Sequence, residues 1–264
     1  MGKIISVTNQ KGGVGKTTTA INLSASLALS GKKVLLIDMD PQANASSGLG
    51  IQADSRGIYE LLLGEASQEE AICSTEIETL KIIPSRVDLT GAEIELVSKE
   101  SREKVLKSAL NGVREEFEFV IIDCPPSLGL LTLNALAVSN SVLIPMQCEY
   151  YALQGLSHLL KTLKLIKKSI NPDLKVEGIL LTMFDSRTLL AAQVKDQVQK
   201  YFSDFLLKTI IPRNVRLSEA PSHGKPIVLY AGRSRGADSY VELAKEIISR
   251  SKLDERTSLK GSGV

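Results

Sequence analysis

A glycine-rich segment near the start of the chain constrains the fold more than any other feature of the sequence. The apolar run Ile4–Thr8 leads through Asn9 and Gln10 into the loop residues Lys11, Gly12, Gly13, Val14, Gly15, Lys16, Thr17 and Thr18. A helical pattern begins directly after this loop. Glycines let the backbone curl so that successive N–H groups point inward, and the start of the helix adds partial positive charge. The segment predicts an α/β fold whose loop binds phosphate groups.

Two side chains of this loop have the chemistry that a nucleotide site needs. Lys16 supplies a positive charge for the β- and γ-phosphates of ATP, and the hydroxyl of Thr17 is placed to ligate Mg²⁺. The general phosphate-loop pattern has glycine where this chain has Gln10, and Lys11 follows as a second cation. A tight turn without a ligand is the alternative. The strand, the lysine, the threonine and the helix in register argue against it.

Apolar runs of strand length alternate with amphipathic helical segments along the chain, which is typical of βα units around a parallel sheet. The expected strands are Ile4–Thr8, Val34–Asp38, Leu80–Pro84, Phe119–Asp123, Ser141–Pro145, Glu177–Thr182, Lys208–Ile211 and Ile227–Leu229. The expected helices are Lys16–Ser30, Arg102–Glu116, Tyr151–Ser169, Leu189–Phe202 and Gly236–Arg250. We therefore predict a P-loop NTPase fold: a mostly parallel, twisted sheet of about seven or eight strands with helices on both faces.

The length of the chain fits one domain. Its 264 residues are enough for a single large α/β core, which we place at residues 1–250. The polar tail, residues 251–264, is expected to fray. No apolar run approaches the roughly 20 residues that span a bilayer, and no secretory signal is evident, so we expect a cytoplasmic protein without a stable membrane anchor.

Aspartates follow two of the expected strands. Asp38 and Asp40 come at the end of the second strand, and Asp123 ends the fourth after a run of apolar residues. Ligands of open parallel sheets bind at the carboxyl ends of the strands, so these acids should face the nucleotide. We expect Asp123 to hold Mg²⁺ through a water molecule; the alternative is an aspartate that caps a loop.

The loop resembles the deviant Walker A form, KGGxGK[ST], of the ParA/MinD family of ATPases. Three further blocks, at residues 38–50, 121–136 and 211–227, resemble the ParA/Soj branch, whose members partition chromosomes and low-copy plasmids in bacteria. The resemblance extends from about residue 2 to about residue 250. It implies an ATPase with a slow intrinsic rate that uses ATP and Mg²⁺ and associates with the nucleoid.

The resemblance also implies roles for individual residues. Asp40 would orient or deprotonate the attacking water, and Asp38 would support the Mg²⁺ ion or act as a switch residue; a purely structural role is the alternative for each. ATP would lie between two subunits of a homodimer, with Lys11 reaching the partner's phosphates, because two facing triphosphates repel unless cations lie between them. Gly12 would lie where the partner's backbone and a phosphate approach so closely that no space is left for a Cβ atom. Pro212, Arg213 and Asn214 would border the adenine, a structural turn being the alternative.

The resemblance implies two macromolecular partners. Family members bind double-stranded DNA without sequence preference as ATP dimers, and Arg187 and Arg216 match positions used there. A ParB/Spo0J-type centromere-binding protein would stimulate hydrolysis. The net charge of +2 does not predict DNA binding by itself, and a solvated charge is an equal alternative for each arginine. Lys161, Lys164 and Lys168 are expected to form a solvated helix face.

Three other classes of protein compete with this interpretation. A membrane-cycling relative like MinD needs a C-terminal amphipathic helix, and residues 247–264 show no sustained apolar face. An iron–sulfur protein of the nitrogenase-reductase type needs suitably placed thiolates, which Cys73, Cys124 and Cys148 do not offer; we expect them to be buried, reduced thiols. A scaffold that binds ATP without hydrolysing it is disfavoured by Asp40.

Overall fold

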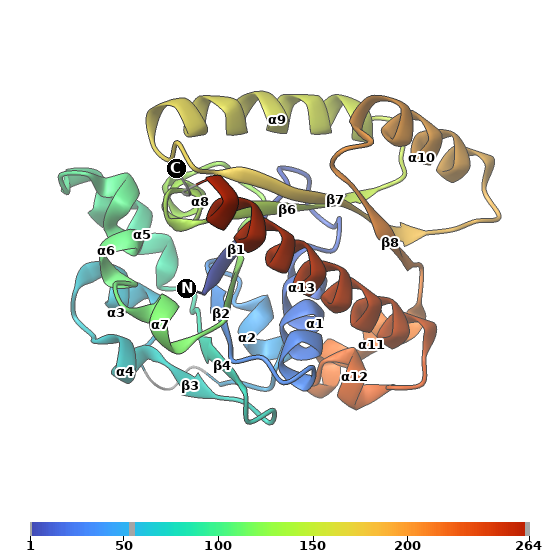
Figure 1. Ribbon diagram of the computed structural model, residues 1–264. Helices are drawn as coiled ribbons and strands as arrows, with labels where there is room; N and C mark the ends of the chain where they lie inside the picture. Colours follow the sequence, from blue (N-terminus) through green and yellow to red (C-terminus); the bar gives the residue numbers. More distant parts are fainter. Residues whose placement is uncertain (1, 53–55, 262–264) are drawn as a thin grey trace.

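The computed structural model describes residues 2–52 and 56–261. Within these ranges one eight-stranded sheet forms the centre, in the order β3-β4-β2-β5-β1-β6-β7-β8 (Figure 1). Its strands are β1 (Lys3–Val7), β2 (Val34–Asp38), β3 (Cys73–Ser74), β4 (Leu80–Ile83), β5 (Phe119–Asp123), β6 (Ser141–Gln147), β7 (Lys175–Phe184) and β8 (Leu206–Pro212). All neighbouring strands are parallel except β3 and β4. The predicted fold class is confirmed.

Helices cover both faces of the sheet. They are α1 (Lys16–Leu29), α2 (Asn44–Gly48), α3 (Ile58–Leu63), α4 (Gln68–Ala71), α5 (Leu89–Glu95), α6 (Val105–Ala109), α7 (Val113–Glu116), α8 (Leu130–Val138), α9 (Ala152–Ser169), α10 (Leu189–Phe202), α11 (Val215–Glu219), α12 (Ile227–Tyr230) and α13 (Arg235–Gly261). Three 3-10 turns, η1 (Leu96–Ser98), η2 (Arg102–Lys104) and η3 (Ala220–His223), complete the described elements. Helices α1 and α13 cover one face, and α3, α8 and α9 lie on the other (Figure 1).

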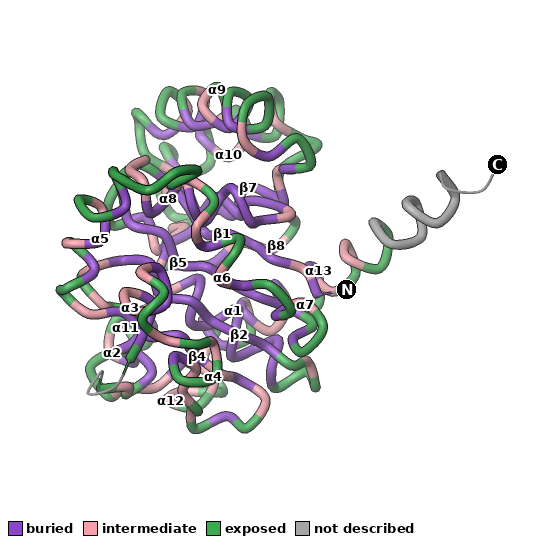
Figure 2. Tube along the Cα trace, turned by 90° about the vertical axis from the view of Figure 1, so that its left-hand side faces the viewer, coloured by how far each residue is buried: buried purple, intermediate pink, exposed green. Residues whose placement is uncertain are grey.

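The strands are apolar throughout because each one is covered on both sides. In β1, Ile5 and Val7 pack with residues of α1 and α13, whereas Ile4 packs with residues of α3 and α8. The interior of the molecule is accordingly buried along the whole sheet, and exposed residues lie on the outer helix surfaces and loops (Figure 2). The helices on both faces hold the central strands in place, and therefore also position the loop that follows β1.

The expected strand Ile227–Leu229 is wrong. These residues form the short helix α12, in which the N–H groups of Leu229 and Tyr230 both donate to the carbonyl of Pro226, at 3.0 Å each. The N–H of Ile227 donates to the Asn22 side chain of α1 at 2.7 Å, which fixes the start of the helix. A short apolar run does not distinguish a strand from a buried helical turn. The eighth strand is instead the two-residue edge strand β3.

The expected helix Arg102–Glu116 is interrupted. It consists of η2, α6 and α7, and Gly112 precedes α7 with a φ of 87°, in the left-handed region that ends a helix. At the other end of the chain, α13 continues past Arg250 to Gly261, into the segment expected to fray, and residues 262–264 lie outside the described ranges. The four remaining expected helices are confirmed within one or two residues at their starts.

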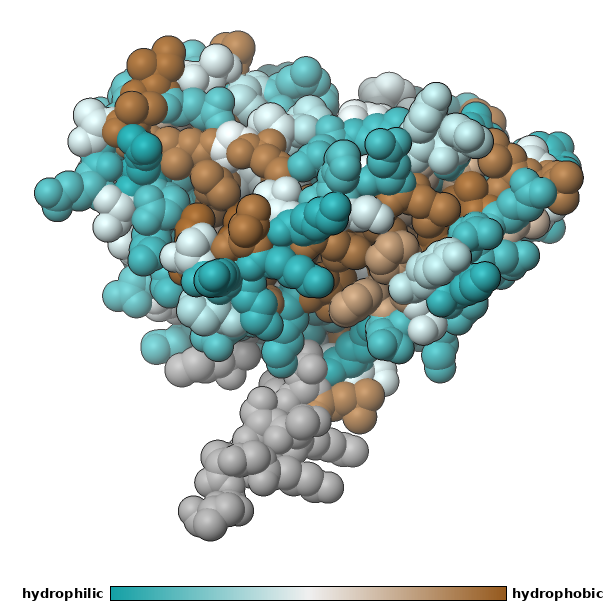
Figure 3. Space-filling model, turned by 90° about the horizontal axis from the view of Figure 1, so that it is seen from above, coloured by the Kyte–Doolittle hydropathy of each residue, from teal (hydrophilic) through white to brown (hydrophobic). Residues whose placement is uncertain are grey.

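The surface is a mosaic of hydrophobic and hydrophilic side chains. Figure 3 looks down onto the side that lies uppermost in Figure 1, and hydrophobic side chains are interspersed there with hydrophilic ones. Within residues 2–52 and 56–261, no helix combines the length and the apolar character needed to cross a membrane.

Candidate functional site

The glycine-rich loop joins the central strand β1 to helix α1, as the sequence predicts. Gly13 and Gly15 have φ values of 72° and 86°, a region that favours glycine because a side chain would be strained there. The N–H of Thr19 donates to the carbonyl of Gly15 at 2.9 Å, so the first turn of α1 closes directly on the loop. The unpaired N–H groups at this helix start therefore face the space above the loop.

Three polar side chains that the sequence analysis did not single out tether the loop to the sheet. Thr182, near the end of β7, donates to the carbonyl of Val14 at 2.8 Å. Gln147, at the end of β6, donates to the carbonyl of Gly13 at 3.1 Å. Asn9 donates to the carbonyl of Pro145 at 2.8 Å. Hydrogen bonds from β6 and β7 thus fix the shape of the loop before any phosphate binds.

The Lys16 side chain lies inside the site. It is 7 % exposed, and its ammonium group donates to the carbonyl of Lys11 at 3.1 Å. Burial lowers the pKa of Lys16 from its ordinary value, and the negative charges of Asp123 and Asp40 oppose that change. The loop therefore holds a cation in position between its own backbone and the acids at the ends of β2 and β5.

Asp38 and Asp123 lie directly opposite each other on the neighbouring strands β2 and β5. Both side chains are buried. The carboxylate of Asp38 accepts hydrogen bonds from the N–H and hydroxyl of Ser46, both at 2.8 Å, and from the N–H of Asp40 at 3.2 Å. Burial raises the pKa of Asp38 to about 6, and the hydrogen bonds from Ser46 oppose this rise. The sequence analysis did not identify Ser46 as the residue that positions Asp38.

Asp123 is a buried carboxylate whose two oxygen atoms have no hydrogen-bond partner among the described residues. Burial raises its pKa well above the usual value, and the charge of Asp38 adds to this rise. The Thr17 hydroxyl lies close enough to Asp123 to lower the pKa of its carboxyl group, but the two groups do not meet the geometry of a hydrogen bond. An unpaired buried carboxylate is costly unless a cation neutralises it, so Asp123 with Thr17 and Asp38 fits a hard divalent cation such as Mg²⁺.

The protein side chains alone do not complete a metal site. Within the described residues, no group of three or more His, Cys, Asp or Glu side chains is arranged to hold a metal ion. Mg²⁺ commonly keeps several waters and binds through one or two carboxylates together with phosphate oxygens. The site therefore fits a metal that arrives with a nucleotide.

Asp40 follows Asp38 by two residues and is 8 % exposed. One of its carboxylate oxygens accepts a hydrogen bond from the N–H of Gln42 at 3.0 Å. Its charge acts on both Lys16 and Asp123, so the structure brings Asp40 to the same site as these residues. Asp40 is therefore a third acid at this site, beside Asp38 and Asp123.

Lys11 points away from this cluster. Its side chain is 48 % exposed and forms an ion pair with Glu149, which follows β6. A Cβ atom built on the neighbouring Gly12 would meet no atom within 4 Å. Nothing within the described part of one chain therefore requires glycine at position 12, and any close approach there has to come from a ligand or from a second chain.

The residues expected near the adenine lie at the same edge of the sheet. Pro212 ends β8, and the N–H of Arg213 donates to the carbonyl of Phe184 at the end of β7, at 3.1 Å. The Asn214 side chain accepts a hydrogen bond from the N–H of Arg216 at 2.9 Å and thereby caps α11. Asn214 thus has a structural role in addition to any contact with a base.

The two arginines expected to bind DNA are exposed and lie outside the phosphate site. The Arg187 guanidinium donates two hydrogen bonds to the Asp185 carboxylate, at 2.8 and 2.7 Å, which lowers the pKa of Asp185 to about 2. Arg216 pairs with Glu219 at 2.8 Å. Both guanidinium groups face solvent, with 85 % and 59 % of their side chains exposed.

The three cysteines are free thiols, but the expected burial is found for Cys124 alone. Cys124 is buried beside Asp123, and burial together with that neighbouring charge raises the pKa of its thiol. Cys73 and Cys148 are half-buried. Burial also raises the pKa of the Cys148 thiol to about 11, so neither Cys124 nor Cys148 is activated as a thiolate.

The fold and the site define the class of P-loop NTPases. Its features here are a central strand, a glycine-rich loop, a buried lysine and two acids at strand ends. A family model described as "AAA domain" matches residues 2–176. The sporulation initiation inhibitor protein Soj of Bacillus subtilis is 61% identical over 249 residues, covering 94% of this chain and 98% of that protein. The chromosome partitioning protein ParA of Myxococcus xanthus is 57% identical over 252 residues, covering 95% and 89%. The chain belongs to the Soj/ParA family of chromosome-partitioning ATPases.

Solved structures show the same fold. A Mycobacterium smegmatis protein described as cobyrinic acid a,c-diamide synthase, with bound ADP and magnesium, has a TM-score of 0.83 and 37% identity, with 96% of each chain covered. The cell division ATPase MinD of Pyrococcus furiosus has a TM-score of 0.79 and 30% identity, with 94% of this chain and 99% of that chain covered. Both likenesses extend over nearly the whole chain.

Proposed function

We propose that this protein binds ATP with Mg²⁺, forms a homodimer around two nucleotides, binds double-stranded DNA without sequence preference in that state, and hydrolyses ATP to drive DNA segregation. The observation that carries the proposal is the convergence of Lys16 and the unpaired carboxylate of Asp123 on one preformed glycine loop. Membership of the Soj/ParA family supports the same assignment.

The first step is capture of the triphosphate. The N–H groups of the loop and the start of α1 would donate to phosphate oxygens, with the Lys16 ammonium adding a full positive charge. Thr17, Asp38 and Asp123 would hold Mg²⁺, which when bound neutralises charge on the phosphate oxygens. Since the loop is already tethered by Gln147 and Thr182, little of the binding energy would be lost in ordering it.

The second step is association of two subunits. Lys11 would leave Glu149 and reach the partner's phosphates, where it reduces the repulsion between two facing triphosphates. The open space at Gly12 would be filled by the opposing subunit. Pro212, Arg213 and Asn214 would border the adenine. The dimer would be the state that binds DNA through Arg187 and Arg216, after each exchanges its carboxylate partner for a phosphate.

Hydrolysis would end the cycle. Asp40 would orient the attacking water and accept its proton, since phosphoryl transfer depends mainly on positioning and electrostatics. Among the described residues its carboxylate accepts one hydrogen bond, from the N–H of Gln42, and it therefore retains lone pairs for a water. We propose a slow intrinsic rate, stimulation by a ParB/Spo0J-type centromere-binding protein, and a location in the cytoplasm on the nucleoid.

Retention on immobilised DNA tests this function, with wild type, Lys16→Ala and Asp40→Ala compared with and without Mg²⁺ and ATP. Wild type should be retained only with ATP and released as ATP is consumed. Lys16→Ala should not be retained, and Asp40→Ala should remain bound because it captures ATP without hydrolysing it. ATP-independent retention of all three proteins would overturn the proposed switch.

A further inference from the structure

The outer surface of α9 carries an unusual concentration of positive charge. Its exposed residues Lys161, Lys164, Lys167 and Lys168, here called the α9 lysine face, form no hydrogen bond or ion pair through their ammonium groups within the described residues. Helix α9 contains no aspartate or glutamate. The whole chain has a net charge of +2, so the residues outside this helix together carry a net negative charge. The net positive charge of the chain therefore comes from this helix.

Helix stability does not explain this arrangement. Lysines at spacings of three and four residues, such as Lys161 with Lys164 and Lys164 with Lys168, repel one another. A single acidic residue on this face would relieve the repulsion. The helix dipole favours cations in the last turn, which accounts for Lys167 and Lys168. It does not account for Lys161 and Lys164, which lie one to two turns further from the helix end.

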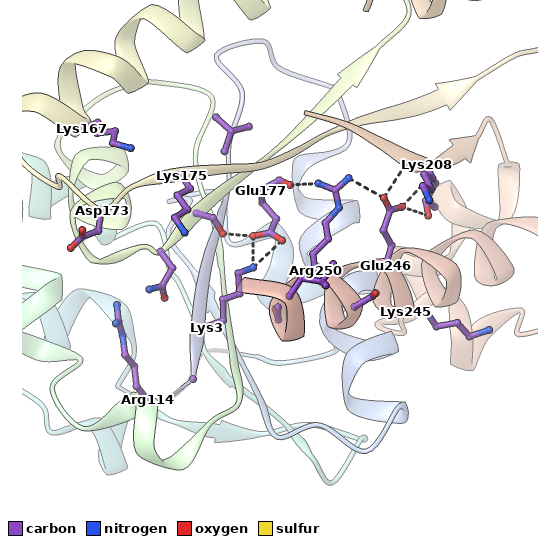
Figure 4. Close-up of a pocket in the computed structure, with 18 of the residues that line it drawn as sticks. Lys3, Arg114, Lys167, Asp173, Lys175, Glu177, Lys208, Lys245, Glu246 and Arg250 are labelled. Atoms are coloured by element: carbon purple, nitrogen blue, oxygen red, sulfur yellow. Dashed lines mark hydrogen bonds and ion pairs between the residues drawn. The ribbon is translucent and has the colours of Figure 1, made fainter. Parts of the chain in front are cut away.

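The α9 lysine face continues into a hollow at the amino-terminal edge of the sheet. Lys167 lines this hollow together with Lys175 of β7 and Lys208 of β8 (Figure 4). Other cations there serve the fold: Lys3 pairs with Glu177 at 2.8 Å, and Arg250 donates to the Glu177 carbonyl at 3.1 Å. The ammonium groups of Lys167, Lys175 and Lys208 have no such partner in the described part of the chain.

We propose that the α9 lysine face is a second DNA-contacting surface, which binds the sugar-phosphate backbone in addition to Arg187 and Arg216. The inference rests on the proposed function. Seven residues separate Lys161 from Lys168, which is about 10 Å along a helix. One DNA strand places a phosphate about every 3.4 Å along the duplex axis, so this length matches about three phosphates.

A lipid surface fits these residues less well than DNA. Between Lys161 and Lys168, Leu165 is the single large hydrophobic side chain that is exposed, and no aromatic residue lies in this stretch. Membrane-surface helices bury a continuous apolar face in the lipid, whereas the apolar residues of α9, such as Leu159 and Leu163, are buried in the protein core. The exposed side of the helix would therefore bind a partner mainly through the charges of its lysines.

The test is the salt dependence of ATP-dependent DNA affinity in the full-length protein. The variant Lys161→Gln/Lys164→Gln removes two cations that the helix dipole does not explain. The matched control Lys104→Gln/Lys107→Gln removes two exposed lysines from the region of α6, and so the same total charge. Each phosphate contact contributes about 0.9 to the slope of log affinity against log salt concentration, so the α9 variant should lose up to about 1.8. The control should keep the wild-type slope.

Three results would overturn the inference. Equal slopes for the α9 variant, the control and wild type would remove the contact while leaving the proposed DNA binding intact. An α9 variant that binds DNA normally but loses ATP-dependent sedimentation with vesicles containing anionic lipid would assign the face to a membrane. Failure of wild type to bind DNA with ATP would overturn the proposed function itself, and this inference with it. Unchanged melting temperatures and ATP affinities of both variants show that the fold and nucleotide site are intact.

Discussion

Lys11 and Glu149 form an ion pair beside the phosphate loop, and about half of each side chain is exposed. The pair holds the lysine of the loop against its own chain, although the proposed dimer needs that lysine at the partner's phosphates. Exposed ion pairs contribute about 0–1 kcal/mol, so the contact is weak enough to exchange. Within a single chain, Glu149 therefore competes with the partner's phosphates for Lys11.

Replacing Glu149 by glutamine should favour the dimer. Glu149→Gln removes the negative charge that holds Lys11 in each of the two subunits, so we expect ATP-dependent dimer affinity to rise by up to about 30-fold, the equivalent of about 1 kcal/mol for each of the two pairs. Analytical ultracentrifugation with Mg²⁺ and ATP measures this change. Glu118→Gln, which removes the partner of Lys32 at a distant exposed pair, is the matched control and should have no effect. A weaker dimer in Glu149→Gln would show that Glu149 instead contacts the partner.

Replacing Asp123 by asparagine should raise the thermal stability of the nucleotide-free protein but reduce the stabilisation that Mg²⁺ and ATP add. Asp123→Asn removes an unpaired buried carboxylate, so we expect the melting temperature of the nucleotide-free protein to rise by roughly 2–4 °C, which corresponds to about 1 kcal/mol. The additional stabilisation by Mg²⁺ and ATP should be largely lost. The exposed Asp173→Asn should change neither value. Normal Mg²⁺-dependent stabilisation of Asp123→Asn would contradict the metal assignment.

The stability of the nucleotide-free protein should fall as pH rises from 4 to 6. Burial raises the pKa of Asp38 to about 6 from the ordinary value of 3.8, so the folded protein binds this proton more tightly than the unfolded chain. The folded state then loses up to about 3 kcal/mol of stability from this group as the pH passes through that window. Urea unfolding in EDTA measures the effect; Asp38→Asn should reduce the fall in stability across this pH window, and the raised pKa of Asp123 should leave a smaller fall in place. An identical profile in the variant would contradict it.

The open space at Gly12 predicts a separation of two functions. Gly12→Val should leave the melting temperature and ATP affinity close to wild type, because its Cβ meets no atom within 4 Å in the single chain. ATP-dependent dimerisation should be lost if the partner fills this space. Calorimetry for ATP and ultracentrifugation for the dimer distinguish the two effects. A dimer of unchanged affinity would show that the partner does not approach Gly12.

The parts of the site that could be predicted from the sequence are those encoded by neighbouring residues. The loop from Lys11 to Thr18 determines its own backbone shape, and Asp123 follows an apolar strand, so both were recognisable locally. Gln147 and Thr182 could not be identified, because they reach the loop only after β6 and β7 have paired with the central sheet. Polar side chains that satisfy backbone carbonyls across strands leave no periodic signal in the chain.

The errors in the fold have the same origin. The run at Ile227 has the composition of a strand, but a hydrogen bond from its N–H to Asn22 of α1 places it in a helical turn. The break near Gly112 depends on one left-handed glycine inside a helical pattern. Local preference is weak in both segments, and contacts with distant parts of the chain determine the outcome.

Isothermal titration of the purified, folded protein with ATP in the presence of Mg²⁺ tests the central claim most directly. Wild type should bind one ATP per chain, and Lys16→Ala should bind at least tenfold more weakly, because it loses the buried cation while the tethered loop remains. Removal of Mg²⁺ with EDTA should weaken binding to wild type but change little in Asp123→Asn. Equal affinity of wild type and Lys16→Ala, or no heat of binding from folded wild type, would contradict the account.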